Sequence, residues 1–171
     1  MSELTDAMGT GITGRPTVTE DSSLSAIMGE LVRTAGSAAG AARLLGVSPT
    51  TFYRWRNAAA EKERGIRQQP KLGKRAMVTA LRNAQTPPGR RRELIRGDKR
   101  MVIKATVIVS NDERDRTIHV GSEIPPQKMG NVIRSWLAGD DDRADRLLDR
   151  HIDENYVEGM RIAAVHDVEF R

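Results

Sequence analysis

Residues 37–57 read SAAGAARLLGVSPTTFYRWRN, and this stretch decides the fold of the first half of the chain. Its small residues predict a short helix that closes on Leu44 and Leu45. Gly46 then supplies a turn, because glycine adopts a positive φ at little cost. Ser48 has the side chain of a helix N-cap, and Pro49 is a favoured first helical residue. The spacing therefore predicts two short helices joined by a tight turn, a helix-turn-helix.

The second predicted helix combines two aromatic residues with a set of polar ones. Phe52 and Trp55 are expected to face the core. In the major groove of DNA, arginine can pair with guanine and asparagine with adenine, while serine and threonine reach bases or phosphates. The candidate DNA contacts are Ser48, Thr50, Thr51, Tyr53, Arg54, Arg56 and Asn57. For each, the alternative is a phosphate contact or an exposed helix face, which is favoured for Arg56. For the whole motif, the alternative is a plain helical hairpin.

The net charge of +5 is unevenly distributed along the 171 residues. Residues 1–53 carry a net charge of −2, residues 54–104 a net charge of +12, and residues 105–171 a net charge of −5. A concentrated basic segment attracts phosphates and releases counterions when it binds them. Beside a helix-turn-helix, this favours nucleic-acid contact over a merely solvated linker. Arg90, Arg91 and Arg92 are therefore further candidate DNA contacts.

Composition narrows the class of protein. The chain has no cysteine, so it has no disulfide framework, thiolate metal site or cysteine nucleophile. No apolar run approaches the roughly 18 residues that a membrane span needs. The first residues lack the basic and apolar regions of a signal peptide. We expect a cytoplasmic, nucleoid-associated protein without membrane contact.

Periodicity and breakers divide the chain into segments. Residues 1–22 lack periodicity and predict a disordered tail, in which Gly9, Gly11 and Gly14 belong to a flexible stretch rather than a dinucleotide loop. Residues 23–84 form the helix-turn-helix domain, with further helices expected over 23–35 and 71–84. Residues 85–100 predict a basic Pro/Arg linker, with a short helix or arm from Arg90 to Ile95.

The remaining residues, 101–171, predict a small α+β domain. Strands are expected over 101–110, 117–120 and 160–170, with a turn at 111–114 and helices over 127–137 and 144–156. The fold class is therefore α+β: an N-terminal all-α helix-turn-helix domain, a basic linker and a C-terminal β-β-α-α-β domain.

Few residues suggest catalysis or metal binding. His119, His151 and His166 lack the spacing of a zinc site, so structural or solvent-facing roles are favoured, with His151 on a charged helix face. The run Asp140, Asp141 and Asp142 fits a helix N-cap better than a calcium loop. No phosphate loop or nucleophile elbow is present. We expect no enzymatic turnover, no metal and no cofactor.

Several features in one order resemble the telomere-protecting terminal proteins of actinomycete linear replicons. They are AARLLGVSPTTFYRW (41–55), the basic stretch, MVIKATVIV (101–109), IPP (124–126) before an apolar helix, GDDDRADRLLDRHIDENY (139–156) and DVEF (167–170). The likeness runs from Thr34 to Phe170. It implies a protein that caps DNA ends and primes replication, with a side-chain hydroxyl joined covalently to the 5′ nucleotide. It further implies a replicative polymerase and a telomere-associated protein as partners.

The resemblance implies a threonine near the domain boundary as the covalent acceptor. Thr106, preceded by VIKA, is the nearest candidate, and Ser110 and Thr117 are the fallbacks. The alternative for Thr106 is a β-branched residue that simply fills a strand. For the whole chain, one alternative function is a dimeric helix-turn-helix transcriptional regulator or plasmid-maintenance factor. The other is a nonspecific structural or relaxosome accessory protein that acts through the basic segment.

Overall fold

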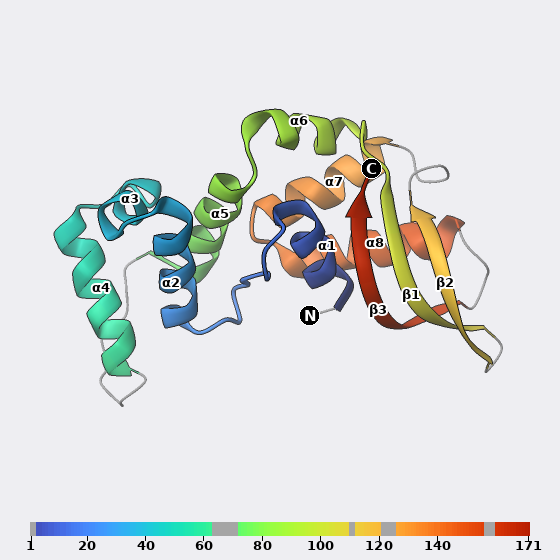
Figure 1. Cartoon of the computed structure of the whole chain (residues 1–171), viewed down its shortest axis with the longest axis horizontal. Helices are drawn as coiled ribbons and strands as arrows, with labels where there is room; N and C mark the ends of the chain where they lie inside the picture. The colour runs from blue at the N-terminus through green and yellow to red at the C-terminus, as the bar shows by residue number, and fades with distance from the viewer. Residues whose placement is uncertain (1–2, 63–71, 110–111, 121–125, 156–159) are drawn as a thin grey trace. The chain divides into compact units, whose positions relative to one another are not determined.

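The computed structural model describes residues 3–62, 72–109, 112–120, 126–155 and 160–171. The chain divides into two compact units, one formed by Val18–Gln85 and the other by Met1–Thr17 together with Thr86–Arg171. The described residues contain eight helices and a three-stranded antiparallel sheet, with the strands in the C-terminal half (Figure 1). This confirms the predicted α+β class.

The unit formed by residues 18–85 is entirely helical. Its helices are α2 (Leu24–Ala35), α3 (Ala38–Leu44), α4 (Pro49–Lys62) and α5 (Lys74–Gln85). Helix α2 packs against the other three, so it forms the centre of the unit. Its start is fixed by Ser23, whose Oγ accepts a hydrogen bond from the Ala26 N–H at 3.1 Å. The helix predicted over 23–35 is confirmed.

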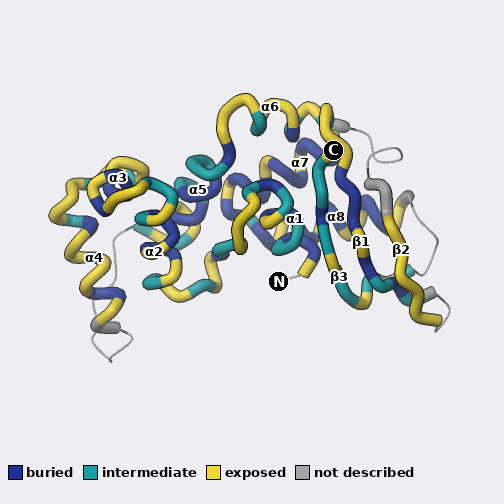
Figure 2. Tube along the Cα trace, in the orientation of Figure 1, coloured by how far each residue is buried: buried dark blue, intermediate teal, exposed yellow. Residues whose placement is uncertain are grey.

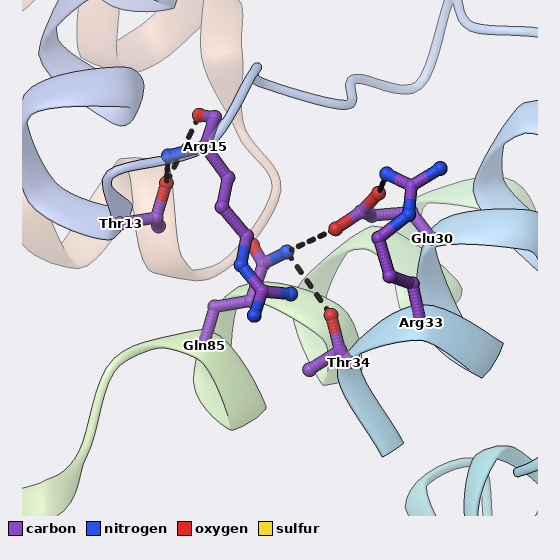
Figure 3. A network of polar contacts seen from close by, with 6 residues as sticks. All are labelled: Thr13, Arg15, Glu30, Arg33, Thr34 and Gln85. Carbon is purple, nitrogen blue, oxygen red and sulfur yellow. Dashed lines mark hydrogen bonds and ion pairs between the residues drawn. The ribbon is translucent and has the colours of Figure 1, made fainter. Parts of the chain in front are cut away.

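A polar network joins α2 and α5, the first and last helices of this unit (Figure 3). The Gln85 side-chain amide on α5 donates to Glu30 Oε1 at 3.1 Å and to Thr34 Oγ1 at 3.2 Å, both on α2. Glu30 is buried and also pairs with Arg33. A buried carboxylate is tolerated only when it is paired and hydrogen-bonded. The hydrogen bond from Gln85 to Glu30 therefore holds α5 against α2.

The second unit is a sheet with helices packed on one face. Its elements are α1 (Glu3–Thr13), α6 (Pro88–Arg96), β1 (Met101–Val109), β2 (Asp112–Val120), α7 (Pro126–Leu137), α8 (Asp141–Asn155) and β3 (Arg161–Phe170). The strand order is β2-β1-β3, with both pairings antiparallel. Alternate residues of β1, from Met101 to Val107, are buried in a core with apolar residues of α1, α7 and α8 (Figure 2). The predicted β-β-α-α-β order is confirmed.

The prediction of a disordered tail over residues 1–22 is wrong for most of that range. Residues 3–13 form α1, and Leu4, Met8 and Ile12 lie at i, i+4 and i+8 and are buried in the core beneath the sheet. Frequent glycine and threonine concealed this short apolar stripe. Residues 18–22 belong instead to the helical unit, where Lys74 Nζ donates to the Ser22 carbonyl at 2.8 Å.

Glycine in α1 is required by close packing rather than by flexibility. A Cβ at Gly11 would overlap the backbone carbonyl oxygen of Val168 on β3. A Cβ at Gly9 would lie 3.0 Å from the Trp136 ring and 2.5 Å from Thr17 Oγ1. Gly11 therefore lets the helix backbone approach β3 closely, and Gly9 lets it approach Trp136 of α7.

The predicted linker over residues 85–100 is also largely structured. Pro88–Arg96 form α6, which packs against α7, and Leu94 is buried in the core of the unit. A Cβ at Gly130 of α7 would overlap the Ile95 carbonyl oxygen, so these two helices are also in close contact. The high charge of the segment lies on the outside of a helix and does not indicate a free chain.

Two boundaries differ from the sequence prediction because charged residues occur inside regular elements. Strand β2 begins at Asp112, within the turn predicted over 111–114, and Asp112 pairs with Val109. Charged residues suit an exposed edge strand, which explains the misassignment. Helix α8 begins at Asp141, and Asp140 caps it by accepting from the Arg143 N–H at 3.3 Å. The predicted capping role of the aspartate run is confirmed.

Replacing Gly11 with alanine tests the packing of α1 on β3. We expect Gly11→Ala to lower the free energy of unfolding by about 1–3 kcal/mol, because the added methyl group overpacks the contact. Urea denaturation is followed by the fluorescence of Trp136. The Trp55→Phe substitution removes the other tryptophan, so the signal reports the unfolding of the sheet unit alone. Gly89→Ala is the control, since a Cβ at Gly89 in α6 meets nothing within 4 Å. Equal stability of the two variants would contradict the docking of α1.

Candidate functional site

The turn between α3 and α4 is fixed by backbone hydrogen bonds. The Gly46 N–H donates to the Arg43 carbonyl at 3.1 Å, and the Val47 N–H donates to the Ala42 carbonyl at 3.0 Å. This pair of bonds is the Schellman motif, which needs a left-handed residue at its centre. Gly46 has φ +66°, as the sequence predicted. The turn therefore sets the direction in which α4 leaves α3.

Helix α4 is anchored by one face. Ser48 Oγ accepts from the Thr51 N–H at 3.1 Å, which confirms Ser48 as the N-cap. Phe52 and Trp55 are buried in the core of the unit, as predicted, and Ala58 and Ala59 are buried one turn later. Val47 is half-buried against the same core. The helix therefore has no freedom to turn its other face inward.

The candidate DNA contacts lie on the outside of α4 and at its start, which Figure 2 shows as mostly exposed. All but one are exposed: Ser48, Thr50, Tyr53, Arg54, Arg56 and Asn57. Thr51 is half-buried, and its hydroxyl lies 2.9 Å from Ser48 Oγ, so both hydroxyls are engaged at the cap. Tyr53 is unusual for a large apolar ring because it is 49% exposed. This face can contact another molecule without any rearrangement.

The three arginines of α6 do not form one equivalent group. Arg90 donates from Nε to the Ile12 carbonyl at 3.2 Å and from a terminal nitrogen to the Gly11 carbonyl at 3.5 Å. These carbonyls belong to the last turn of α1, where helical partners are missing. Arg91 is half-buried, and Arg92 is exposed. Of the three, Arg92 is the one free to meet a phosphate, while Arg90 joins α6 to α1.

Thr106 lies on the face of the sheet opposite the core. It is half-buried at the middle of β1, between residues of β1 that are buried on the other face. Its hydroxyl donates to Asp115 Oδ1 at 2.7 Å and lies 2.7 Å from His166 Nε2. Asp115 is its direct partner on β2, and His166 comes from β3. We call Thr106, Asp115 and His166 the hydroxyl cluster.

An irregularity in β3 brings His166 into the hydroxyl cluster. The pairing of β1 with β3 passes from Lys104 opposite Asp167 to Ala105 opposite Val165, so His166 is the extra residue. Neighbouring residues of a regular strand point to opposite faces. Here Asp167 contacts Lys104 while His166 contacts Thr106, and both lie on the open face. A β-bulge commonly re-aims a side chain in this way beside a functional site.

The hydrogen positions in the cluster follow from a count of donors. A threonine hydroxyl has one hydrogen, and an ionised carboxylate only accepts. The hydroxyl hydrogen is therefore directed to Asp115, and His166 must carry its own hydrogen on Nε2 and donate to Thr106. Asp115 and His166 are open to an approaching molecule, with side chains 85% and 52% exposed.

Beside this cluster, Lys104 bridges two carboxylates of β3. Its Nζ lies 2.9 Å from both Asp167 and Glu169, and Arg171 lies 2.8 Å from Glu169. Hydrogen bonds from Lys104 and Arg171 lower the pKa of Glu169 to about 2. Hydrogen bonds to Glu169 and Asp167 raise the pKa of Lys104. These charges are balanced among themselves, so Lys104 is not available to neutralise an incoming anion.

The histidines differ from the sequence expectation in two respects. His151 does not lie on an exposed charged face, because its side chain on α8 is only 6% exposed. Burial lowers its pKa, Lys128 lowers it further, and Glu154 at 3.9 Å opposes both effects. His166 lies in the last strand, as predicted, and its contact with Thr106 in the hydroxyl cluster was not predicted. His119 lies in β2, but its side chain is outside the described residues, as is the fallback acceptor Ser110.

Thr117, the other fallback acceptor, is exposed on β2 opposite Lys104. The resemblance singled out Thr106 as a candidate, whereas the sequence analysis did not bring Asp115 or His166 together with it. No local signal links them, since His166 is 60 residues away from Thr106 and is placed by the bulge.

The described residues contain no helix that could span a membrane and no group of three potential metal ligands. Comparison with protein-family models, curated proteins and solved structures finds no match.

The different positions of Arg90 and Arg92 give a test of the α6–α1 contact. We expect Arg90→Ala to lower the free energy of unfolding by about 1–3 kcal/mol, because the carbonyls at the end of α1 lose a charged donor. Arg92→Ala is expected to change it by less than about 0.5 kcal/mol. Urea denaturation monitored by Trp136 fluorescence provides the measurement. An unchanged stability in both variants would rule out a structural role for Arg90.

Proposed function

We propose that the chain is a DNA-binding protein that inserts α4 into the major groove. The observation that carries this proposal is the polar, exposed face of α4 on a helix held rigidly by Phe52 and Trp55. In a helix-turn-helix, the second helix enters the groove and its N-terminal residues contact base edges. Arg54 has the side chain best suited to a guanine, and Asn57 to an adenine. Ser48 and Thr50 are suited to phosphates at the groove edge.

We further propose that the protein serves the ends of a linear or mobile bacterial replicon, as the terminal-protein resemblance implies. In this function Thr106 becomes joined to the 5′ nucleotide, and a replicative polymerase supplies the nucleotide and extends the strand. The chain itself is the acceptor rather than a turnover enzyme. The position of the Thr106 hydroxyl, on an open face of a rigid strand, supports this assignment. Holding one group in a fixed geometry is the main requirement for such a step.

The role of Arg54 in reading DNA is tested by substitution. We expect Arg54→Ala to reduce discrimination between a preferred duplex, selected from a random library, and a random duplex by roughly 10- to 100-fold. Fluorescence anisotropy at several salt concentrations measures both affinities. Arg143→Ala, an exposed arginine on α8, is the control and should leave discrimination unchanged. An equal loss of affinity for both duplexes would assign Arg54 to the phosphate backbone instead.

Covalent priming is tested by incubating the chain with host extract and α-labelled deoxynucleoside triphosphates before denaturing electrophoresis. We expect label on the wild-type chain and on Thr106→Ser, which keeps the hydroxyl. Thr106→Val keeps the shape but lacks the hydroxyl, so it should take no label. Label retained on Thr106→Val would place the acceptor elsewhere. No label on the wild-type chain, in an extract that labels a known terminal protein, would contradict priming. A palindromic binding site would then favour the dimeric regulator.

A further inference from the structure

We propose that Asp115 is the general base that activates the Thr106 hydroxyl and that His166 is the residue that positions it. This inference rests on the proposed priming function and assigns chemistry to two residues for which the resemblance implies no role. The substrate class is a deoxynucleoside 5′-triphosphate held by a polymerase.

The geometry supplies the first argument. Asp115 Oδ1 lies 2.7 Å from Thr106 Oγ1 and accepts its hydrogen, so the proton acceptor already makes the hydrogen bond along which the proton moves. A general base must lie within hydrogen-bond reach of the proton that it takes. His166 Nε2 also lies 2.7 Å from the same oxygen, so the hydroxyl is held between the two side chains.

The position of the cluster supplies the second argument. Regular pairing alone places Asp115 opposite Thr106, but His166 reaches Thr106 only because β3 carries an extra residue there. Bulges weaken a strand pairing and persist where a side chain must be re-aimed. A second irregularity in β3 makes Ala163 an extra residue as well, so the argument rests on the contact of His166 with Thr106 rather than on the bulge alone.

The charge around Thr106 identifies where the substrate comes from. Asp115, Asp167 and Glu169 are carboxylates on or beside the cluster, and Lys104 is already paired with the last two. A free triphosphate would be repelled by the unbalanced carboxylate. The nucleotide must therefore arrive with its charge neutralised by the enzyme that holds it. An open sheet face, rather than a pocket, suits delivery by a docking partner.

The step balances without an oxidant or reductant. The Thr106 oxygen forms a bond to the α-phosphorus of the triphosphate. The bond from that phosphorus to the oxygen bridging the β-phosphorus breaks, and pyrophosphate leaves with the electron pair. The hydroxyl proton passes to Asp115. His166 donates to the same oxygen before the reaction and holds its free lone pair toward the phosphorus.

Isosteric variants separate this chemistry from a structural role. Asp115→Asn keeps an oxygen that accepts the threonine hydrogen but cannot take the proton. We expect its initial labelling rate to fall by about 10²- to 10⁴-fold, the usual contribution of a general base. Asp115→Glu restores a carboxylate and should recover most of the rate. Asp112→Asn, at an exposed carboxylate of the same strand, is the matched control and should label like the wild type. Full labelling of Asp115→Asn would overturn the inference.

The positioning role has its own comparison. His166→Gln retains an N–H donor and should keep the labelling rate within about tenfold, whereas His166→Ala should lose more than this. Equal rates for His166→Ala and the wild type would remove His166 from the mechanism. Circular dichroism melts confirm that each variant is folded.

A measurement without polymerase tests the same arrangement independently. Nitrogen-15 NMR of the wild-type chain reports which ring nitrogen of His166 carries a proton. The inference requires a protonated Nε2. An unprotonated Nε2 would make His166, and not Asp115, the acceptor of the hydroxyl hydrogen and would overturn the proposal. If the wild-type chain takes no label, the priming function fails. If it takes label and Asp115→Asn does so equally, only this inference fails.

Discussion

The register of β1 between its two neighbours is the constraint on which the sheet unit depends. One face of β1 presents alternate apolar residues to the helices, and the other presents Lys104 and Thr106. A slip of one residue would exchange the two faces, bury the polar side chains and expose the core. The same pairing therefore fixes both the hydrophobic core and the partners of Thr106. Stability and the candidate chemistry depend on one set of backbone hydrogen bonds.

The sequence predicted the elements whose apolar spacing is continuous. The two short helices joined by a tight turn, the burial of Phe52 and Trp55 and the β-β-α-α-β order were recognisable because each follows from local periodicity and turn chemistry. Helix α1 was missed because glycines interrupt its apolar stripe, and these serve packing against residues far along the chain, Gly11 against Val168 and Gly9 against Trp136. The exposed position of Arg54 was predictable, whereas the engagement of Arg90 with α1 required tertiary structure. The role of Arg54 in DNA binding stays a prediction.

The hydroxyl cluster shows why sites are harder to predict than elements. Thr106 and Asp115 could be paired from two strands and their register, but the second strand was predicted to begin at Thr117, which left Asp115 outside it. His166 was assigned to the correct strand, yet regular alternation does not bring it beside Thr106. One extra residue in β3 does so. A bulge leaves little trace in a pattern of hydrophobic and polar residues, so the third member needed the backbone geometry.

The arrangement of the sheet unit also determines when it can form during synthesis. Helix α1 leaves the ribosome before the helical unit of residues 18–85, but β3, against which Gly11 packs, leaves after it. The helical unit of residues 18–85 lies between them and can fold while the chain is still growing. The nascent chain thus acquires the α4 surface before the hydroxyl cluster, which lacks His166 until β3 has been made. In the proposed function, an incomplete chain would therefore carry the DNA-contacting helix but no oriented Thr106 hydroxyl.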